Sequence, residues 1–145
     1  MIKETIYIEK PINEVWDFVE LQFAKAFKCS PSKILGKETT AETLNFTGKT
    51  MTVSQKITTV DKEKHLVMTS ESGRDLVESH YEFEADESDN GTYLTFYESG
   101  EGKKSKLRSM NFSFFSLPIL RRSTKKKFRR RLESLKVMIE SDDEL

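Results

Sequence analysis

The chain has 145 residues, enough for one ordinary domain with a sizeable core and too few for two. Hydrophobic residues make up 36% and charged residues 33%, and 24 basic residues balance 24 acidic ones, which argues against a general polyanion binder. The charges are nevertheless segregated. Residues 102–136 carry thirteen Lys and Arg against one Glu, a net charge of +12, whereas residues 1–101 sum to −8 and residues 137–145 to −4.

The N-terminal residues, the apolar stretches and the cysteine content together predict the cellular compartment. The chain is charged from Lys3 onward, which is not the pattern of a secretory signal peptide. No stretch approaches the roughly 20 apolar residues that a membrane-spanning helix needs. Cys29 is the single cysteine, so an intramolecular disulfide and a cysteine metal cluster are both excluded. We expect a cytoplasmic protein that forms a single domain over residues 1–145, with residues 142–145 as a frayed acidic tail.

The first elements are a strand and a helix. Residues 4–9 alternate apolar and polar side chains, which predicts a half-buried strand with its isoleucines on one face. Pro11 ends this strand because it lacks the N–H that a ladder needs. Asn13 is a suitable cap for a helix that continues to about Lys28, with a break near Leu21 as an alternative.

A run of strands follows, because the apolar period changes from 3.6 to 2 between residues 34 and 100. Asn90-Gly91 is the sharpest hairpin signal, since tight primed turns need positive φ at both central residues. The predicted strands form an antiparallel meander at about Ile34–Thr39, Thr43–Phe46, Thr50–Val60, His65–Glu71, Asp75–Ala85 and Thr92–Glu101.

The last third of the chain is predicted to be helical at its end. Residues 102–109 form a basic linker, and residues 110–120 form an aromatic segment. A long helix is expected over about residues 121–141, because apolar residues recur there at spacings of four, three and four. This stripe consists of Phe128, Leu132, Leu135 and Ile139. The order of elements predicts an α+β fold in which a curved sheet buries its concave face on the last helix.

Three segments carry a resemblance to a known superfamily: the opening IYIEKPINEVWDF of residues 6–18, the hairpin NGTYLTFYESG of residues 90–100, and the ending FRRRLESLKVMI of residues 128–139. Together they resemble the START-like, or SRPBCC, superfamily, and the chain looks like a small bacterial branch of unknown function. The resemblance implies a helix-grip fold with a cavity between sheet and C-terminal helix. It does not imply one activity, because the superfamily includes lipid carriers, hormone receptors, aromatase/cyclases and co-chaperones of the heat-shock ATPase.

Strand alternation predicts which side chains line this cavity. The expected lining is Met51, Val53, Gln55, Met68, Tyr81, Phe83, Phe96, Glu98, Phe114, Phe128 and Leu132. Glu98 continues the apolar face of the last strand, where desolvation would raise a carboxyl pKa toward values useful for general acid/base catalysis. The alternative is that Glu98 lies solvated at a rim. Tyr81 is either a polar-head contact for a ligand or a core aromatic.

The sequence contains no convincing metal, nucleophile or phosphate site. His65 and His80 are the only histidines, and with Cys29 they do not make the three or four ligands of a zinc site. On the strand assignment, His80 lies on the face opposite Tyr81. No nucleophile elbow or Gly-rich phosphate loop is present in the sequence. We therefore expect no metal and no cofactor.

The basic segment has three interpretations. Aromatic residues flanked by cations are typical of binding to an anionic membrane surface. The alternative is that the aromatics close the cavity and the cations form the wet face of the helix. Nucleic-acid binding is disfavoured, because the rest of the chain is acidic. The cations considered for a membrane or anion surface are Lys103, Lys104, Arg121, Arg122, Lys125, Lys126 and Lys127.

Taken together, these patterns favour non-catalytic binding of a small hydrophobic or amphipathic ligand, such as a lipid or a polyketide-like molecule. One alternative is a cyclase/hydratase-type enzyme that uses Glu98 or Tyr81. Another is an interaction module for membranes or proteins that uses residues 103–131. The sequence predicts neither the ligand's identity nor the oligomeric state.

Overall fold

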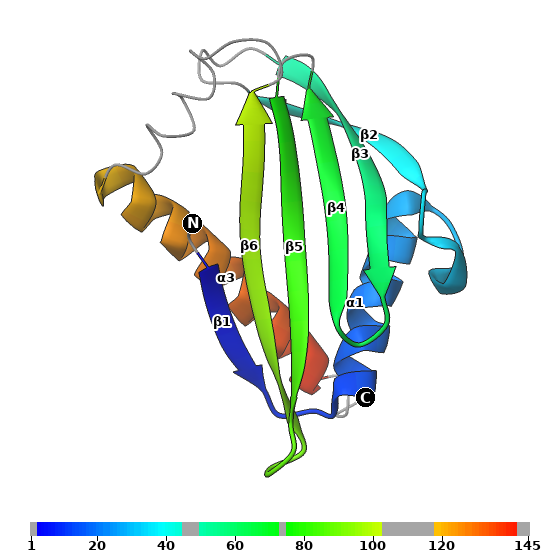
Figure 1. Ribbon diagram of the computed structural model, residues 1–145, viewed down its shortest axis with the longest axis vertical. Coiled ribbons are helices and arrows are strands. Elements are labelled where there is room, and N and C mark those ends of the chain that lie inside the picture. Colours follow the sequence, from blue (N-terminus) through cyan, green and yellow to red (C-terminus); the bar gives the residue numbers. More distant parts are fainter. Residues whose placement is uncertain (1–2, 45–49, 73–74, 103–117, 142–145) are drawn as a thin grey trace.

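Six antiparallel strands form one curved sheet in the order β1-β6-β5-β4-β3-β2 (Figure 1). The computed structural model describes residues 3–44, 50–72, 75–102 and 118–141. The strands are β1 (Lys3–Ile8), β2 (Glu38–Leu44), β3 (Thr50–Asp61), β4 (His65–Ser72), β5 (Asp75–Asp86) and β6 (Gly91–Gly102). The helices are α1 (Ile12–Phe27), the short 3-10 helix η1 (Pro31–Lys33) and α3 (Pro118–Ser141). The predicted α+β fold class is confirmed.

The predicted strands agree with the observed ones except at the start of the meander. Residues 34–39 and 43–46 were expected to form two strands, but β2 is continuous from Glu38 to Leu44. Ile34 is buried in a turn rather than in a strand. Gly36 has a φ of 82° there, and its N–H donates to the Ile57 carbonyl at 2.8 Å. The turn therefore delays the strand, because positive φ is incompatible with an extended backbone.

The predicted hairpin between β5 and β6 is confirmed, but its turn is longer than expected. Asp86 pairs with Gly91, so four residues connect the strands. Of the two turn residues, Asn90 has a φ of 57°, and Gly91 is already the first residue of β6. Gly91 is buried, and the ring and hydroxyl of Tyr7 occupy the space where a Cβ on this residue would lie. The glycine is therefore needed for close approach rather than for the turn.

Helix α1 is unbroken, so the alternative of a break near Leu21 is wrong. Its N-cap is Pro11, whose carbonyl accepts from the N–H groups of Glu14 and Val15, and not Asn13, which lies inside the helix. Lys28 ends the helix in the left-handed region, and the N–H of Cys29 then reaches the Ala24 carbonyl at 3.0 Å.

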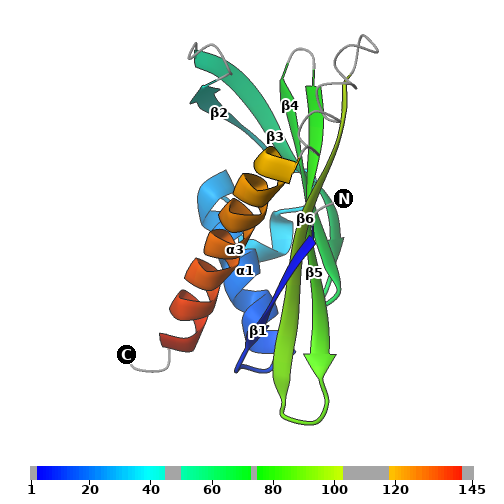
Figure 2. The same ribbon diagram turned by 90° about the vertical axis from the view of Figure 1, so that its left-hand side faces the viewer.

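Both long helices lie on the same face of the sheet (Figure 2). Helix α3 begins at Pro118, three residues before the predicted start at residue 121. Proline fits the first turn of a helix because the N–H groups of that turn have no intrahelical partners. The predicted stripe faces the sheet: Phe128, Leu132 and Ile139 are buried, and Leu135 is partly buried against the core. None of the described helices covers the other face of the sheet (Figure 2).

Candidate ligand-binding groove

A groove of about 420 Å³ lies between α1 and α3, with the middle of β5 as its floor. Pockets for small molecules usually have volumes of roughly 300 to 1,000 Å³ and mostly apolar walls with few polar groups. The residues that line it are Val19, Gln22, Phe23, Ala26, Tyr81, Arg131, Ser134, Leu135 and Met138. The groove is thus of the right size and character for a small apolar or amphipathic molecule.

A chain of aromatic rings runs from the groove into the packed core. The ring centroid of Phe23 lies 5.5 Å from that of Tyr81, which lies 4.9 Å from Phe96, and Phe96 lies 4.7 Å from Phe128. The first and last pairs meet edge to face, which is a favourable geometry for aromatic pairs. These contacts fix the orientation of the Tyr81 ring from both sides.

Arg131 and Tyr81 form the polar end of the groove. The Arg131 guanidinium lies 4.8 Å from the centroid of the buried Phe96 ring, and Arg131 and Tyr81 both line the groove. Burial raises the pKa of Tyr81 above its ordinary value of 10.0; the nearby Arg131 opposes this shift, and Glu98 adds to it. The phenol is therefore neutral at physiological pH and keeps its proton.

Glu98 is half-buried on the concave face, opposite Ser79 in the ladder. The hydroxyl of the buried Ser79 donates to Glu98 Oε2 at 3.0 Å. Tyr81 is the next concave residue along β5, so a carboxylate, a hydroxyl and a phenol follow one another towards Arg131. The predicted role of Glu98 or Tyr81 in catalysis stays a prediction.

The predicted cavity residues divide into several groups. Tyr81 lines the groove, whereas Phe83, Phe96, Phe128 and Leu132 are buried within the packed core. Met68 is partly buried against that core, and Val53 and Gln55 are half-buried on β3. The side chain of Met51 and the whole of Phe114 lie outside the described residues.

The sequence reasoning missed the residues that the two helices contribute to the groove. Arg131 was counted only as one of many cations, although it lies three residues after Phe128 and four before Leu135. That spacing places it on the flank of the apolar stripe, next to the core. Phe23 lies within the predicted first helix, but its place opposite α3 depends on tertiary packing.

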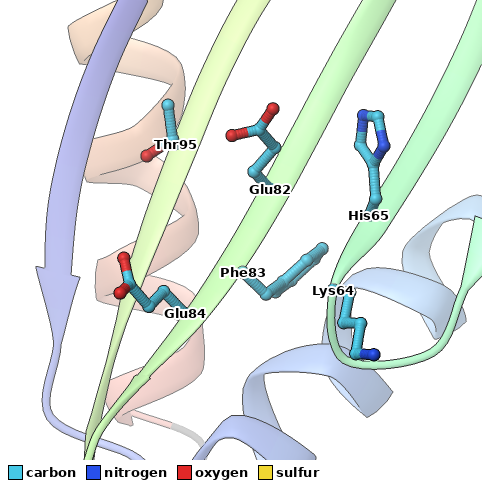
Figure 3. A pocket seen from close by; sticks show the side chains of 6 residues that line it. All are labelled: Lys64, His65, Glu82, Phe83, Glu84 and Thr95. Atoms are coloured by element: carbon cyan, nitrogen blue, oxygen red, sulfur yellow. The ribbon is translucent and has the colours of Figure 1, made fainter.

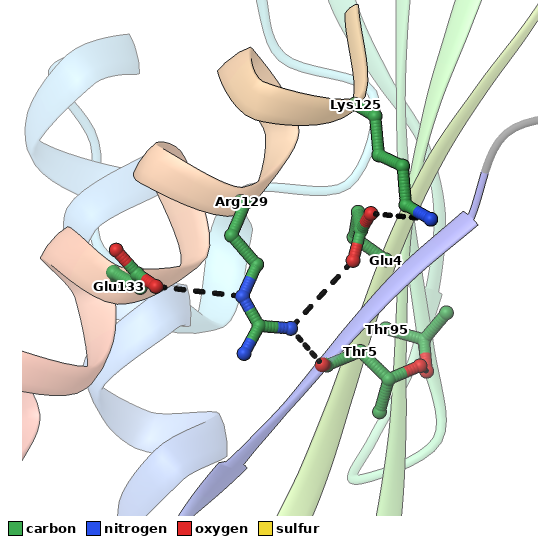
Figure 4. A network of polar contacts seen from close by, with 6 residues as sticks. All are labelled: Glu4, Thr5, Thr95, Lys125, Arg129 and Glu133. Atoms are coloured by element: carbon green, nitrogen blue, oxygen red, sulfur yellow. Dashed lines mark hydrogen bonds and ion pairs between the residues drawn. The ribbon is translucent and has the colours of Figure 1, made fainter. Parts of the chain in front are cut away.

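Several cations of the basic segment make contacts within the protein. Lys125 lies 3.7 Å and Arg129 lies 3.6 Å from the carboxylate of Glu4, which is buried on β1 (Figure 4). Arg129 also donates to the Thr5 carbonyl at 3.1 Å and lies 3.4 Å from Glu133. These cations attach α3 to β1, so they are only partly available to a membrane surface.

The other cations predicted to form a membrane or anion surface are either exposed or outside the part of the chain that the structure describes. Lys126 and Lys127 are exposed on α3. Arg121 and Arg122 belong to the start of α3, but their side chains are not among those described, and Lys103 and Lys104 lie outside the described residues. The proposed role of these residues in membrane binding stays a prediction. No helix within the described ranges is long and apolar enough to span a membrane.

The far end of α3 is attached to β1 in the same way. Lys136 Nζ donates to the Tyr7 carbonyl at 2.6 Å and to Glu140 Oε2 at 3.0 Å. Glu140 in turn accepts from the N–H of Glu9 at 2.8 Å, and these bonds lower the pKa of its carboxyl although partial burial opposes the shift. Helix α3 is thus held along the whole length of β1.

The outer face of the sheet carries the two histidines. His65 and His80 lie on β4 and β5 with their ring nitrogens 2.9 Å apart, and His80 stacks on Tyr97 with ring centroids separated by 4.4 Å. The outward orientation predicted for His80 is confirmed, but the two histidines are neighbours rather than isolated. Partial burial lowers the pKa of His80, and the adjacent His65 lowers it further.

A second depression, of about 310 Å³, lies beside His65 on the outer face (Figure 3). It is lined by Lys64, His65, Glu82, Phe83, Glu84 and Thr95. Its lining is mostly charged or polar, unlike that of the groove. Among the described residues, no group of three or more His, Cys, Asp and Glu side chains is placed to hold a metal ion.

Comparison with known proteins gives a family and several similar structures. The sequence matches the model of the family described as "Activator of Hsp90 ATPase homolog 1-like protein" over residues 10–140. No curated protein matches the sequence significantly.

Among solved structures, the crystal structure of Ara h 8.0201 has a TM-score of 0.61 at 16% identity, with 97% of each chain covered. A protein from Thermus thermophilus has a TM-score of 0.59 at 13% identity, again with 97% of each chain covered. A conserved protein from Geobacillus kaustophilus has a TM-score of 0.57 at 16% identity, covering 96% of this chain and 94% of that one. At these identities the likeness concerns the fold alone.

Proposed function

The chain belongs to the AHSA1-like family, which lies within the SRPBCC, or helix-grip, superfamily that the sequence predicts. From this premise we propose that it binds a small hydrophobic or amphipathic ligand without covalent chemistry. The binding site is the groove between α1 and α3. The observation that carries this proposal is the groove itself, which has a volume of about 420 Å³ and mostly apolar walls and lies beside a packed core.

The packing of the core supports the groove over a deeper cavity. Phe96 and Leu132 are 0% exposed, and Phe83 and Phe128 are 6% and 3% exposed. These side chains fill the described space between sheet and α3, so a ligand has room only beside them. Met138, which is 44% exposed at the groove, would lose contact with water when a ligand binds.

Binding can be tested with the neutral fluorescent probe N-phenylnaphthylamine, whose emission rises in apolar surroundings. The unmodified protein should bind the probe with saturation. Ala26→Trp fills the groove from the α1 wall and should abolish saturable binding. Leu21→Trp is the matched control, because Leu21 is 39% exposed on another face of α1 and does not line the groove.

A second variant guards against a folding defect in the first. Met138→Trp fills the groove from the α3 wall, and it should also abolish binding. Native mass spectrometry of protein purified from its own host should show a co-purifying small molecule that the two groove-filling variants lose. Saturable probe binding that both of these folded variants retain would rule the groove out as the site.

A further inference from the structure

Arg131 differs from the other cations that reach inward from α3. Lys125, Arg129 and Lys136 each lie within 4.0 Å of a carboxylate oxygen. Among the residues that the structure describes, no carboxylate is that close to Arg131. Its guanidinium instead lies over the buried Phe96 ring and against the Tyr81 phenol. Within the described part of the chain, the groove therefore contains a permanent positive charge that no carboxylate pairs with directly.

Arg131 and Tyr81 both offer donors to a ligand. A guanidinium has only donors, so Arg131 cannot accept the Tyr81 proton, and the phenol can donate it to a ligand. Arg131 adds N–H donors arranged in a rigid planar fork. A cationic donor and a neutral hydroxyl donor thus line the same apolar groove.

Glu98 is the acid that could oppose an anion here. It influences the Tyr81 phenol electrostatically, but its carboxylate accepts from Ser79 at 3.0 Å and makes no ion pair with Arg131 within 4.0 Å. Its carboxylate is therefore engaged by Ser79, which lies two residue pairs along the ladder from Tyr81.

We propose that the groove selects amphipathic acids, with the ligand carboxylate bound by Arg131 and the Tyr81 hydroxyl and its apolar body against Phe23, Leu135 and Met138. This inference rests on the proposed function. A carboxylate fits because its two oxygens match the planar fork of a guanidinium, and the low-dielectric surroundings strengthen the pair. An alcohol of the same length would keep the apolar contacts and lose the charge pairing.

The test compares three probes of equal chain length and different head group: decanoate, decanol and decyltrimethylammonium. Each displaces N-phenylnaphthylamine from the unmodified protein at concentrations below micelle formation. Decanoate should displace the probe at a concentration about tenfold lower than decanol, because a hydrogen bond to a charged group is stronger than one between neutral groups. Decyltrimethylammonium should be the weakest of the three.

Variants assign the preference to its residues. Arg131→Gln should remove the advantage of decanoate while leaving decanol unchanged, and Arg131→Lys should restore part of it. Tyr81→Phe should reduce the advantage a few-fold. Lys126→Gln is the matched control, because it removes one exposed cation from another face of α3 and should change neither ligand.

The outcomes separate the two proposals. Equal displacement by decanoate and decanol would overturn the selection of acids while leaving groove binding intact. Failure of the unmodified protein to bind N-phenylnaphthylamine or any of the three displacers would refute the proposed function itself. A decanoate preference that survives in folded Arg131→Gln would show that another cation recognises the anion. If Arg131→Gln does not fold, the unmodified protein and Arg131→Lys still decide the question.

Discussion

Two leucines of α3 provide a quantitative check on whether the groove is open in solution. Leu132 is 0% exposed beneath the sheet, and Leu135 is only partly buried because it also forms the groove wall. Both residues lie on one helix, three positions apart, so substituting each by alanine changes helix propensity equally. The difference in unfolding free energy between the two alanine variants therefore reports on the burial of the two leucine side chains.

The expected cost follows from the atoms removed. Leu132→Ala removes three buried carbons, which gives a transfer term of about 2 kcal/mol, and the cavity left in the core raises the loss of unfolding free energy to about 3 to 4 kcal/mol. Leu135→Ala removes atoms that face the groove for part of their surface. Water can enter the space they leave, so we expect a loss of about 1 to 1.5 kcal/mol.

Urea unfolding followed by tryptophan fluorescence measures both values. Trp16 is the single tryptophan, is 1% exposed and meets the Phe83 ring edge to face at 5.0 Å, so its emission should change sharply when the core opens. Equal losses for the two variants would mean that Leu135 is fully enclosed and the groove closed, which would refute the reasoning. Leu135→Ala should also weaken N-phenylnaphthylamine binding, whereas Leu132→Ala should preserve the groove wall.

Two further predictions concern the sheet. The pKa of His80 is lowered from 6.5 by partial burial and by His65, so the unfolded chain binds more protons than the folded one just below that value. Unfolding free energy should therefore fall as the pH drops through 6.5, and His80→Gln should flatten that part of a urea-unfolding profile; an unchanged profile would contradict this. Gly91→Ala should cost about 1 to 3 kcal/mol in urea unfolding, because its Cβ displaces the Tyr7 ring. Tyr7→Ala should relieve the clash, so in that background Gly91→Ala should cost little; an equal cost in both backgrounds would locate the strain elsewhere.

The fold could be predicted from sequence because its signals are local. The alternation in β1 and the stripe from Phe128 to Ile139 each require only one element to be recognised. The two wrong predictions of element boundaries also have local causes. Gly36 has a positive φ, so β2 begins after it, and the backbone carbonyl of Pro11 rather than the side chain of Asn13 caps α1.

The groove could not be predicted in the same way, because it arises between elements. Phe23 and Arg131 are more than a hundred residues apart, and only the packing of both helices on one face of the sheet brings them to the same space. The approach of His65 to His80 depends likewise on the register of β4 and β5, where Val67 rather than His65 is directly opposite His80. Such diagonal neighbours are not visible in a strand pattern taken alone.

The bonds from α3 to β1 also bear on how copies of this protein can associate. An outermost strand exposes backbone groups that can template pairing with another chain, which is a common route to aggregation. On β1 the Thr5 and Tyr7 carbonyls already accept hydrogen bonds from Arg129 and Lys136. Sheet extension through β1 therefore requires α3 to be displaced first, so Arg129 and Lys136 guard this edge of the sheet against pairing with another chain.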